Sequence, residues 1–314
     1  MTWPFHDHAP AYAIIDIALP QLREQWYARA GSPSSVPLYL DTPLAHLTDV
    51  SPVLTEIDAD SPFLPWVAEH RPDLNWGVLF CSTANLNDIA AHLRKTLTVI
   101  DTDDDEILLR FYDPDVLPLF WQALSPGEQQ LFSGPVTTWA ARRTGSIDDL
   151  WQGDPPKEPG QTDWANLEAP WLTLTDRHQA ALQPLYHRHL RQALLVKLQK
   201  TMAWRIMHLS PGFLESRIDE ALHALYPWDA MPDTDIALAF CRLCMEQCSH
   251  FHQSPRAQTS LRQSPLTDAL AALQGDIAQQ PEHYTPFHDP AWMPAFDESA
   301  LTAKRRANRW SNQG

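Results

Sequence analysis

The stretch Glu106-Ile-Leu-Leu-Arg-Phe-Tyr-Asp-Pro-Asp115 organises the N-terminal part of the chain. Its apolar side chains alternate and polar residues bound the run, which predicts a strand buried on at least one face. Leu97–Ile100 lies just before it, across the acidic tip 101–105, and the two segments predict a hairpin. Asp113 and Pro114 then predict a helix start, because Asp accepts from an orphan N–H and Pro suits the first helical position.

Apolar runs on both sides of this stretch predict strands and helices in alternation. The predicted strands are 12–18, 36–40, 52–57, 75–81 and 136–140. Predicted helices follow start signals at Pro20, Ser61, Asn85 and Ser125. This alternation indicates an α/β (α+β) N-terminal lobe with a mixed sheet.

The second half of the chain has a helical pattern. Apolar positions 182, 185, 186, 190, 193 and 194 mark one face of a helix that extends from about 175 to 209. Further helices are predicted near 213–226, 234–251 and 265–278, so we expect an all-α helical C-terminal lobe. The resulting division is an α/β domain at 1–143, a Pro- and Trp-containing linker at 144–170, a helical bundle at 171–280 and a Pro- and aromatic-rich tail at 281–314.

Composition narrows the classes of function. The 314 residues carry a net charge of −16, which disfavours nucleic acid or an anionic membrane as the main partner. The N-terminus lacks the pattern of a signal peptide and no run is long enough to span a bilayer, so we expect a cytoplasmic protein. The Gly positions include no nucleotide-binding or nucleophile-elbow motif, and we expect neither a cofactor nor a catalytic set.

Three tryptophans in the predicted linker permit two interpretations. Trp151, Trp164 and Trp171 can pin the linker to its own domains, or they can face a partner, because Trp is frequent at binding hot spots. We treat these three residues as candidate partner-binding residues.

Two groups of residues suggest metal ligands. Cys241, Cys244, Cys248 and His250, with His252 nearby, offer zinc-type ligands. The same cysteines also follow one stripe of a helix, where buried Cys packs as a small hydrophobe, and we favour that interpretation. Asp101, Asp103 and Asp105 match the first ligand positions of a calcium loop, but the glycine and glutamate of that loop are absent, which favours a solvated hairpin tip.

The order of several short motifs supports a resemblance to a known family. These motifs are Tyr12–Ile17, Pro37–Leu40, Ser51–Leu54, Ser61-Pro62, Trp76-Gly77, Thr98-Val99, Leu109–Pro114 with its Tyr112, and Phe132–Pro135. Over about residues 10–140 this series resembles the N-terminal domain of the type VI secretion effector adaptors, a domain first described as one of unknown function.

The resemblance implies a binding function without covalent chemistry. Such an adaptor binds the N-terminal segment of a cognate toxic effector and loads it onto the VgrG spike protein. We therefore expect a chaperone-like, non-enzymatic bacterial protein. The alternative is a metal-binding (zinc) hydrolase or sensor that uses Cys241, Cys244, Cys248 and His250.

Overall fold

We describe a computed structural model of the chain. It describes residues 4–5, 10–29, 34–71, 74–142, 150–156 and 164–293. Contacts divide the chain into two compact units, residues 1–185 and 186–314. The first unit is an α+β fold and the second is helical, so the predicted fold class is confirmed.

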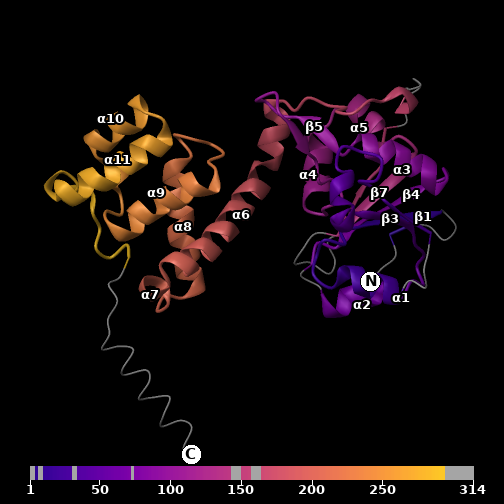
Figure 1. Cartoon of the computed structure of the whole chain (residues 1–314), viewed down its shortest axis with the longest axis horizontal. Coiled ribbons are helices and arrows are strands. Elements are labelled where there is room, and N and C mark those ends of the chain that lie inside the picture. The colour runs from indigo at the N-terminus through magenta and orange to yellow at the C-terminus, as the bar shows by residue number, and fades with distance from the viewer. Residues whose placement is uncertain are drawn as a thin grey trace, which may run out of the picture. The chain divides into compact units, whose positions relative to one another are not determined.

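A six-stranded sheet forms the centre of the first unit (Figure 1). The strand order is β2-β3-β1-β4-β7-β8. The strands are β1 (Ala11–Ile15), β2 (Ser35–Pro37), β3 (Val53–Glu56), β4 (Gly77–Ser82), β7 (Val136–Arg142) and β8 (Leu150–Gly153). Every strand pair in this sheet is antiparallel, whereas a mixed sheet was predicted.

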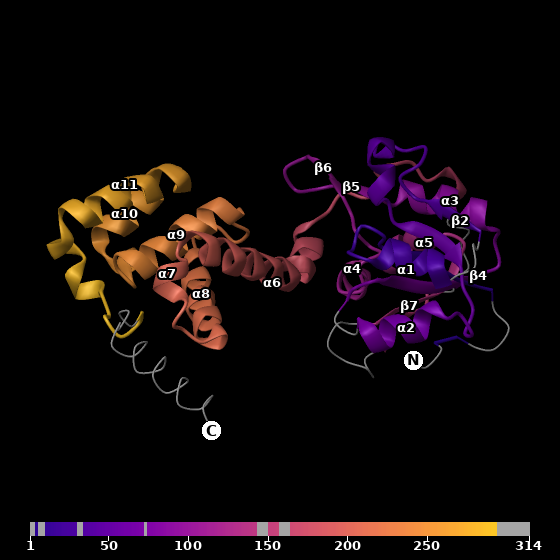
Figure 2. The same cartoon turned by 60° about the horizontal axis from the view of Figure 1, so that its bottom comes forward.

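Alternation along β1 separates the two faces of the sheet. Tyr12 and Ile14 join one core cluster, while Ala13 and Ile15 join another on the opposite face. The first face is covered by α3 (Leu86–Lys95), α4 (Val116–Ala123) and α5 (Pro126–Ser133), and the second by α1 (Leu22–Arg29) and α2 (Phe63–His70). The sheet therefore lies between two helical layers, as Figures 1 and 2 show.

The predicted hairpin is confirmed, but its second strand is not buried. β5 (Thr98–Ile100) pairs with β6 (Glu106–Leu108) as a separate two-stranded sheet, and β6 is exposed along its length. Burial begins after β6, at Leu109, Phe111 and Tyr112. These three side chains reach the core from the turns that lead into α4, so their alternation reflected burial without a strand.

Two segments differ from the predicted division into domain, linker and bundle. Leu150–Gly153, which was predicted to be linker, forms β8 and pairs with β7. The residues 143–149 and 157–163 of the predicted linker lie outside the described residues. The first turns of α6 (Asp176–Thr201) belong to the first unit, because Leu174 and Leu182 pack with its core.

The second unit is a bundle around one large core. Its helices are the rest of α6, then α7 (Ala203–Ile206), α8 (Pro211–Leu225), α9 (Thr234–Glu246), α10 (Pro255–Gln263) and α11 (Leu266–Gln279). Short 3₁₀ turns occur in this unit at η3 (Phe251–Gln253), η4 (Pro281–His283) and η5 (Thr285–Phe287), and in the first unit at η1 (Ala45–Val50) and η2 (Trp164–Asn166). Tyr284 and Trp292, which were assigned to the tail, are buried in this core, and residues 294–314 lie outside the described residues. Among the described helices, none combines the length and apolarity that a membrane crossing requires.

Candidate functional site

Trp76 and Gly77 join the sheet to the helical layer. Trp76 is buried against Phe63, with ring centroids 5.5 Å apart, and its carbonyl accepts from the Asp16 N–H at 2.9 Å. Gly77 has φ +153°, and a Cβ there would lie 1.9 Å from the Ile14 carbonyl oxygen. The predicted Trp-Gly motif is therefore a close approach between β1 and β4 that requires glycine.

Asp113 and Pro114 lie in the turn before α4. They are not the cap and first residue of the helix, as was predicted. The Asp113 Oδ1 accepts from the Asp115 N–H at 2.9 Å and from the Asn75 Nδ2 at 3.0 Å. The α4 helix begins at Val116, two residues after the predicted start. The Asp113 side chain thus satisfies backbone and amide donors, which is a structural role.

Tyr112 belongs to a polar cluster beneath the sheet edge. Its hydroxyl lies 2.8 Å from the Tyr39 hydroxyl, and both tyrosines are buried. Arg110 donates to Asp16 Oδ2 at 2.6 Å, and its guanidinium lies 5.6 Å from the Tyr112 ring centroid. Burial raises the pKa of Tyr112, and the hydrogen bond to Tyr39 adds to the rise, so both hydroxyls stay protonated at neutral pH.

Tyr39 starts a closed loop, residues 39–51, that connects β2 to β3. The neck of the loop is closed by the Leu38 N–H, which donates to the Pro52 carbonyl at 3.0 Å, and by the Tyr39 N–H, which donates to Ser51 Oγ at 2.9 Å. Loops of this length with adjacent ends are compact and frequently functional.

Contacts from three elements hold the 39–51 loop in place. Tyr112 holds Tyr39, Arg94 of α3 lies 3.4 Å from Asp41 Oδ2, and Arg23 of α1 donates to the Asp49 carbonyl at 3.3 Å. A loop fixed at several points loses little conformational entropy when it binds.

This fixed loop presents apolar side chains to solvent. Leu40, Leu47 and Val50 are each exposed by 40–46%. Their grouping on one compact loop is typical of a surface that contacts another protein. We define the candidate site as the 39–51 loop. These three residues were not identified as a surface from the sequence. Leu40 ended a predicted strand, and the 3₁₀ turn η1, which carries Leu47 and Val50, buries none of its residues.

Two of the three candidate tryptophans pack on the core of their own unit. Trp151 on β8 packs edge to face on Trp121, with ring centroids 5.9 Å apart. Trp171 lies 5.8 Å from Phe132 and 6.3 Å from Phe120. Both are half-buried. The pinning interpretation accounts for these contacts, and a partner contact through their exposed edges stays a prediction.

Trp164 covers a buried histidine. Its ring lies edge to face on His92, with centroids 5.4 Å apart. The His92 Nε2 donates to the Phe132 carbonyl at 2.9 Å, and a Cβ on Gly134 would lie 2.4 Å from the His92 ring. Burial lowers the pKa of His92 to about 4, so the ring is neutral at neutral pH.

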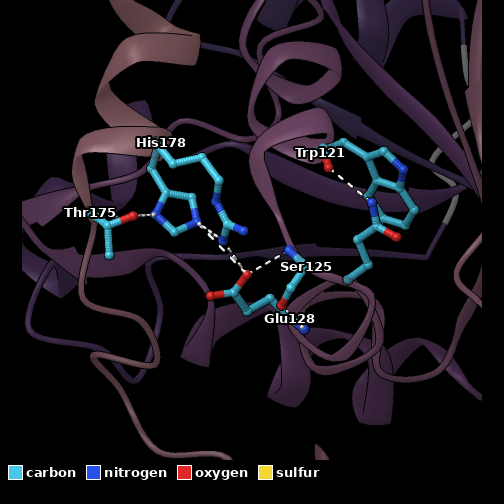
Figure 3. A network of polar contacts seen from close by, with 7 residues as sticks. Trp121, Ser125, Glu128, Thr175 and His178 are labelled. Carbon is cyan, nitrogen blue, oxygen red and sulfur yellow. Dashed lines mark hydrogen bonds and ion pairs between the residues drawn. The ribbon is translucent and has the colours of Figure 1, made fainter.

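A second polar network fixes the start of α6 (Figure 3). Glu128 Oε2 accepts from the Ser125 N–H at 2.6 Å and from Arg177 at 2.8 Å. The buried His178 accepts at Nδ1 from the Thr175 N–H at 3.0 Å, and burial lowers its pKa. Burial raises the pKa of Glu128, but the Ser125 hydrogen bonds and the charges of His178 and Arg177 outweigh it, leaving that pKa below its usual value. The capping box predicted at Ser125 is confirmed. The other contacts of the network attach the start of α6 to α5.

The cysteine stripe is part of the helical core. Cys241, Cys244 and Cys248 are buried, and burial raises the pKa of Cys241 to about 12. Core packing, the favoured interpretation, is confirmed. His250 instead lies 2.9 Å from the Ser249 hydroxyl through its Nδ1. Within the described part of the chain, no group of three or more His, Cys, Asp or Glu side chains is placed to hold a metal ion. The Asp101 Oδ1 accepts from the Asp103 and Asp105 N–H groups, which is the geometry of a hairpin tip.

One cavity in the second unit is lined by ionisable groups. It has a volume of about 820 Å³, and its lining includes Asp219, Glu220, His250 and His252. Two of its three carboxylates, Asp219 and Glu220, are already engaged. Asp219 pairs with Arg191 at 2.9 Å, while Glu220 pairs with Arg217 at 2.6 Å and accepts from Trp292 Nε1 at 2.5 Å. Carboxylates held in ion pairs are poor general bases, so Asp219 and Glu220 have a structural role in this lining.

The first unit is thus an α+β domain with a closed loop that exposes three apolar side chains. Residues 11–131 match the family model described as "Domain of unknown function (DUF4123)", and the matched segment extends from β1 into α5. Strands β7 and β8 and the helical unit lie beyond the match. Searches of the curated proteins and of the solved structures found no match to the chain.

Proposed function

We propose that this protein is an effector adaptor of a type VI secretion system. In this proposal the chain binds the N-terminal segment of a cognate toxic effector in the cytoplasm and loads it onto the VgrG spike. It catalyses no reaction. The DUF4123 match at residues 11–131 and the ordered resemblance over the same region support this assignment.

The structural observation that carries the proposal is the 39–51 loop. Leu40, Leu47 and Val50 are exposed on a loop that Tyr112, Arg94 and Arg23 contact. A prearranged apolar surface binds a protein at a lower entropic cost than a mobile loop. The polar groups below it, Asp16 with Arg110 and Tyr39 with Tyr112, satisfy one another, which suits a scaffold better than a reaction centre.

Substitution of the loop tests the proposal. We expect the double variant Leu47→Asp and Val50→Asp to lose capture of the partner, because two buried carboxylates would replace apolar contacts at the interface. The chain is co-expressed with the effector encoded beside its gene and with VgrG, and each partner is quantified after affinity purification. At least a tenfold drop in recovery of one partner is expected.

The matched control is Leu150→Asp, a leucine of the same unit that is 37% exposed compared with 40% for Leu47. It should leave recovery unchanged. Equal recovery of both partners with the loop variant and with wild type would remove the loop from the binding surface. Failure of the wild-type chain to capture either partner would contradict the adaptor function itself.

A further inference from the structure

The short helix α7 carries the two most exposed large apolar side chains among the described residues. Trp204 is 65% exposed and Met207 is 64% exposed. They are three residues apart, and the backbone is still helical at Met207, so both side chains lie on one side of the turn. Trp and Met are enriched in protein interfaces.

The core does not need these two side chains. The neighbouring Met202 and Ile206 are buried in the core of the second unit and attach α7 to it. The Arg205 guanidinium lies 5.8 Å from the Trp204 ring centroid and donates to the Glu246 carbonyl at 3.4 Å, so it supports the exposed indole from one side. We call Trp204, Arg205 and Met207 the α7 patch.

The surrounding segment has the opposite charge to the rest of the protein. Residues 186–214 contain no Asp or Glu, although the whole chain has a net charge of −16. The cations of this segment are Arg188, Arg191, Lys197, Lys200 and Arg205. Arg191 and Lys197 pair with carboxylates of α8 and α9, whereas Lys200 is exposed. Lys200 and Arg205 therefore place positive charge within about one turn of Trp204, in a stretch of chain without Asp or Glu.

We infer that the α7 patch docks an acidic amphipathic segment of a protein partner. An apolar side chain of that segment packs on Trp204 and Met207, and its carboxylates face Lys200 and Arg205. The inference rests on the proposed function, since it names a binding surface and the chemistry of the effector segment that the adaptor would hold.

Charge distinguishes this occupant from three others. A long polyanion such as nucleic acid, or an anionic membrane, extends past the patch and meets the acidic remainder of the chain. Two copies that joined through their α7 patches would bring like charges together. A short acidic segment with one apolar face matches both the cations and the two exposed apolar side chains of the patch.

Three labelled 18-residue peptides test the chemistry on the full-length chain. The first has leucines at helical spacing i, i+3, i+4 and i+7 with glutamates elsewhere, the second has lysines in place of the glutamates, and the third has serines in place of the leucines. Fluorescence anisotropy at low and high salt measures their affinities. We expect the first peptide to bind at least tenfold more tightly than the others, and added salt to weaken it.

The double variant Trp204→Ala and Met207→Ala is expected to weaken the first peptide at least tenfold. Its melting temperature should match that of wild type because both side chains are exposed. Met231→Ala, which removes another exposed side chain of the same unit outside residues 186–214, is the control and should bind as wild type does. Equal affinity of the double variant, or equal affinity for the lysine peptide, would overturn the inference.

Three further readouts assign any failure to one claim. If the co-expressed effector co-purifies equally with wild type and with the double variant, the patch assignment fails and the adaptor function stands. If the effector co-purifies with neither protein, the adaptor function fails. The peptide affinities then decide whether the α7 patch binds an acidic segment. If wild type is a dimer on gel filtration and the double variant is not, the patch binds a second copy of the chain. If wild type binds anionic vesicles and the double variant does not, the patch binds a membrane. Either result would overturn the inference.

Discussion

Replacing Gly77 by alanine is expected to destabilise the first unit by at least about 4 kcal/mol, which places it among the most damaging kinds of single substitution. The added Cβ would lie 1.9 Å from the Ile14 carbonyl oxygen, an atom of the paired strand that cannot turn away. The φ of +153° adds strain for any L side chain. The free energy of unfolding, measured by urea titration, and the soluble yield should both fall sharply.

Gly127→Ala provides the matched control. A Cβ at Gly127 meets nothing within 4 Å, and the residue lies in the first turn of α5. Alanine is the better helix former, so this variant should be as stable as wild type or up to about 1 kcal/mol more stable. A Gly77→Ala protein within about 1 kcal/mol of wild type would contradict the close approach of β1 and β4.

Acidification from pH 7 to pH 4.5 is expected to remove about 2.5 kcal/mol of stability through His92. Burial lowers the pKa of the folded-state ring from 6.5 to about 4. Between these values the unfolded chain binds a proton that the folded chain does not. The contribution is therefore complete above pH 6.5 and is lost as the pH falls towards 4.

The variant His92→Gln isolates this contribution, because its amide can still donate to the Phe132 carbonyl while carrying no titrating group. The difference in unfolding free energy between pH 7 and pH 4.5 should shrink by about 2.5 kcal/mol relative to wild type. The exposed His46→Gln should change it little. An unchanged pH dependence in His92→Gln would show that protonated His92 is tolerated in the folded state.

The parts of the fold that depend on local signals could be predicted from the sequence. Asn85 caps α3 through the N–H groups of Asn87 and Asp88, and Ser125 forms its capping box, because caps need only neighbouring residues. The Ser254-Pro255 start of α10 has the same form, but no helix was predicted between residues 251 and 265. Only Ala257 and Leu261 of α10 are buried, so its apolar pattern is weak.

Features that depend on tertiary contacts could not be predicted. β8 is only four residues long and owes its structure to pairing with β7, so the sequence pattern indicated linker. Leu109 and Phe111 alternate like strand residues, yet they are buried from turns. Periodicity records which side chains are buried and leaves open the backbone that buries them.

The tryptophans show the same limit. The tryptophans Trp151 and Trp171 attracted attention by residue type, but their neighbours Trp121 and Phe132 come from other helices. The exposure of Trp204 could have been predicted from its position relative to the apolar stripe. The apolar stripe that includes Leu190 and Leu194 continues through Leu198, Met202 and Ile206, which are all buried, and Trp204 falls outside it. A large apolar residue off the stripe of a helix is a sign of an exposed surface.

Secretion of the neighbouring effector tests the central claim most directly, namely that this protein acts by holding another polypeptide. The effector and VgrG are quantified in the culture medium of cells with the intact gene, without it, and complemented with the loop variant Leu47→Asp and Val50→Asp. The adaptor function predicts that deletion removes the effector from the medium, that wild type restores it and that the loop variant does not. Undiminished effector secretion and normal intracellular effector levels after deletion would contradict it.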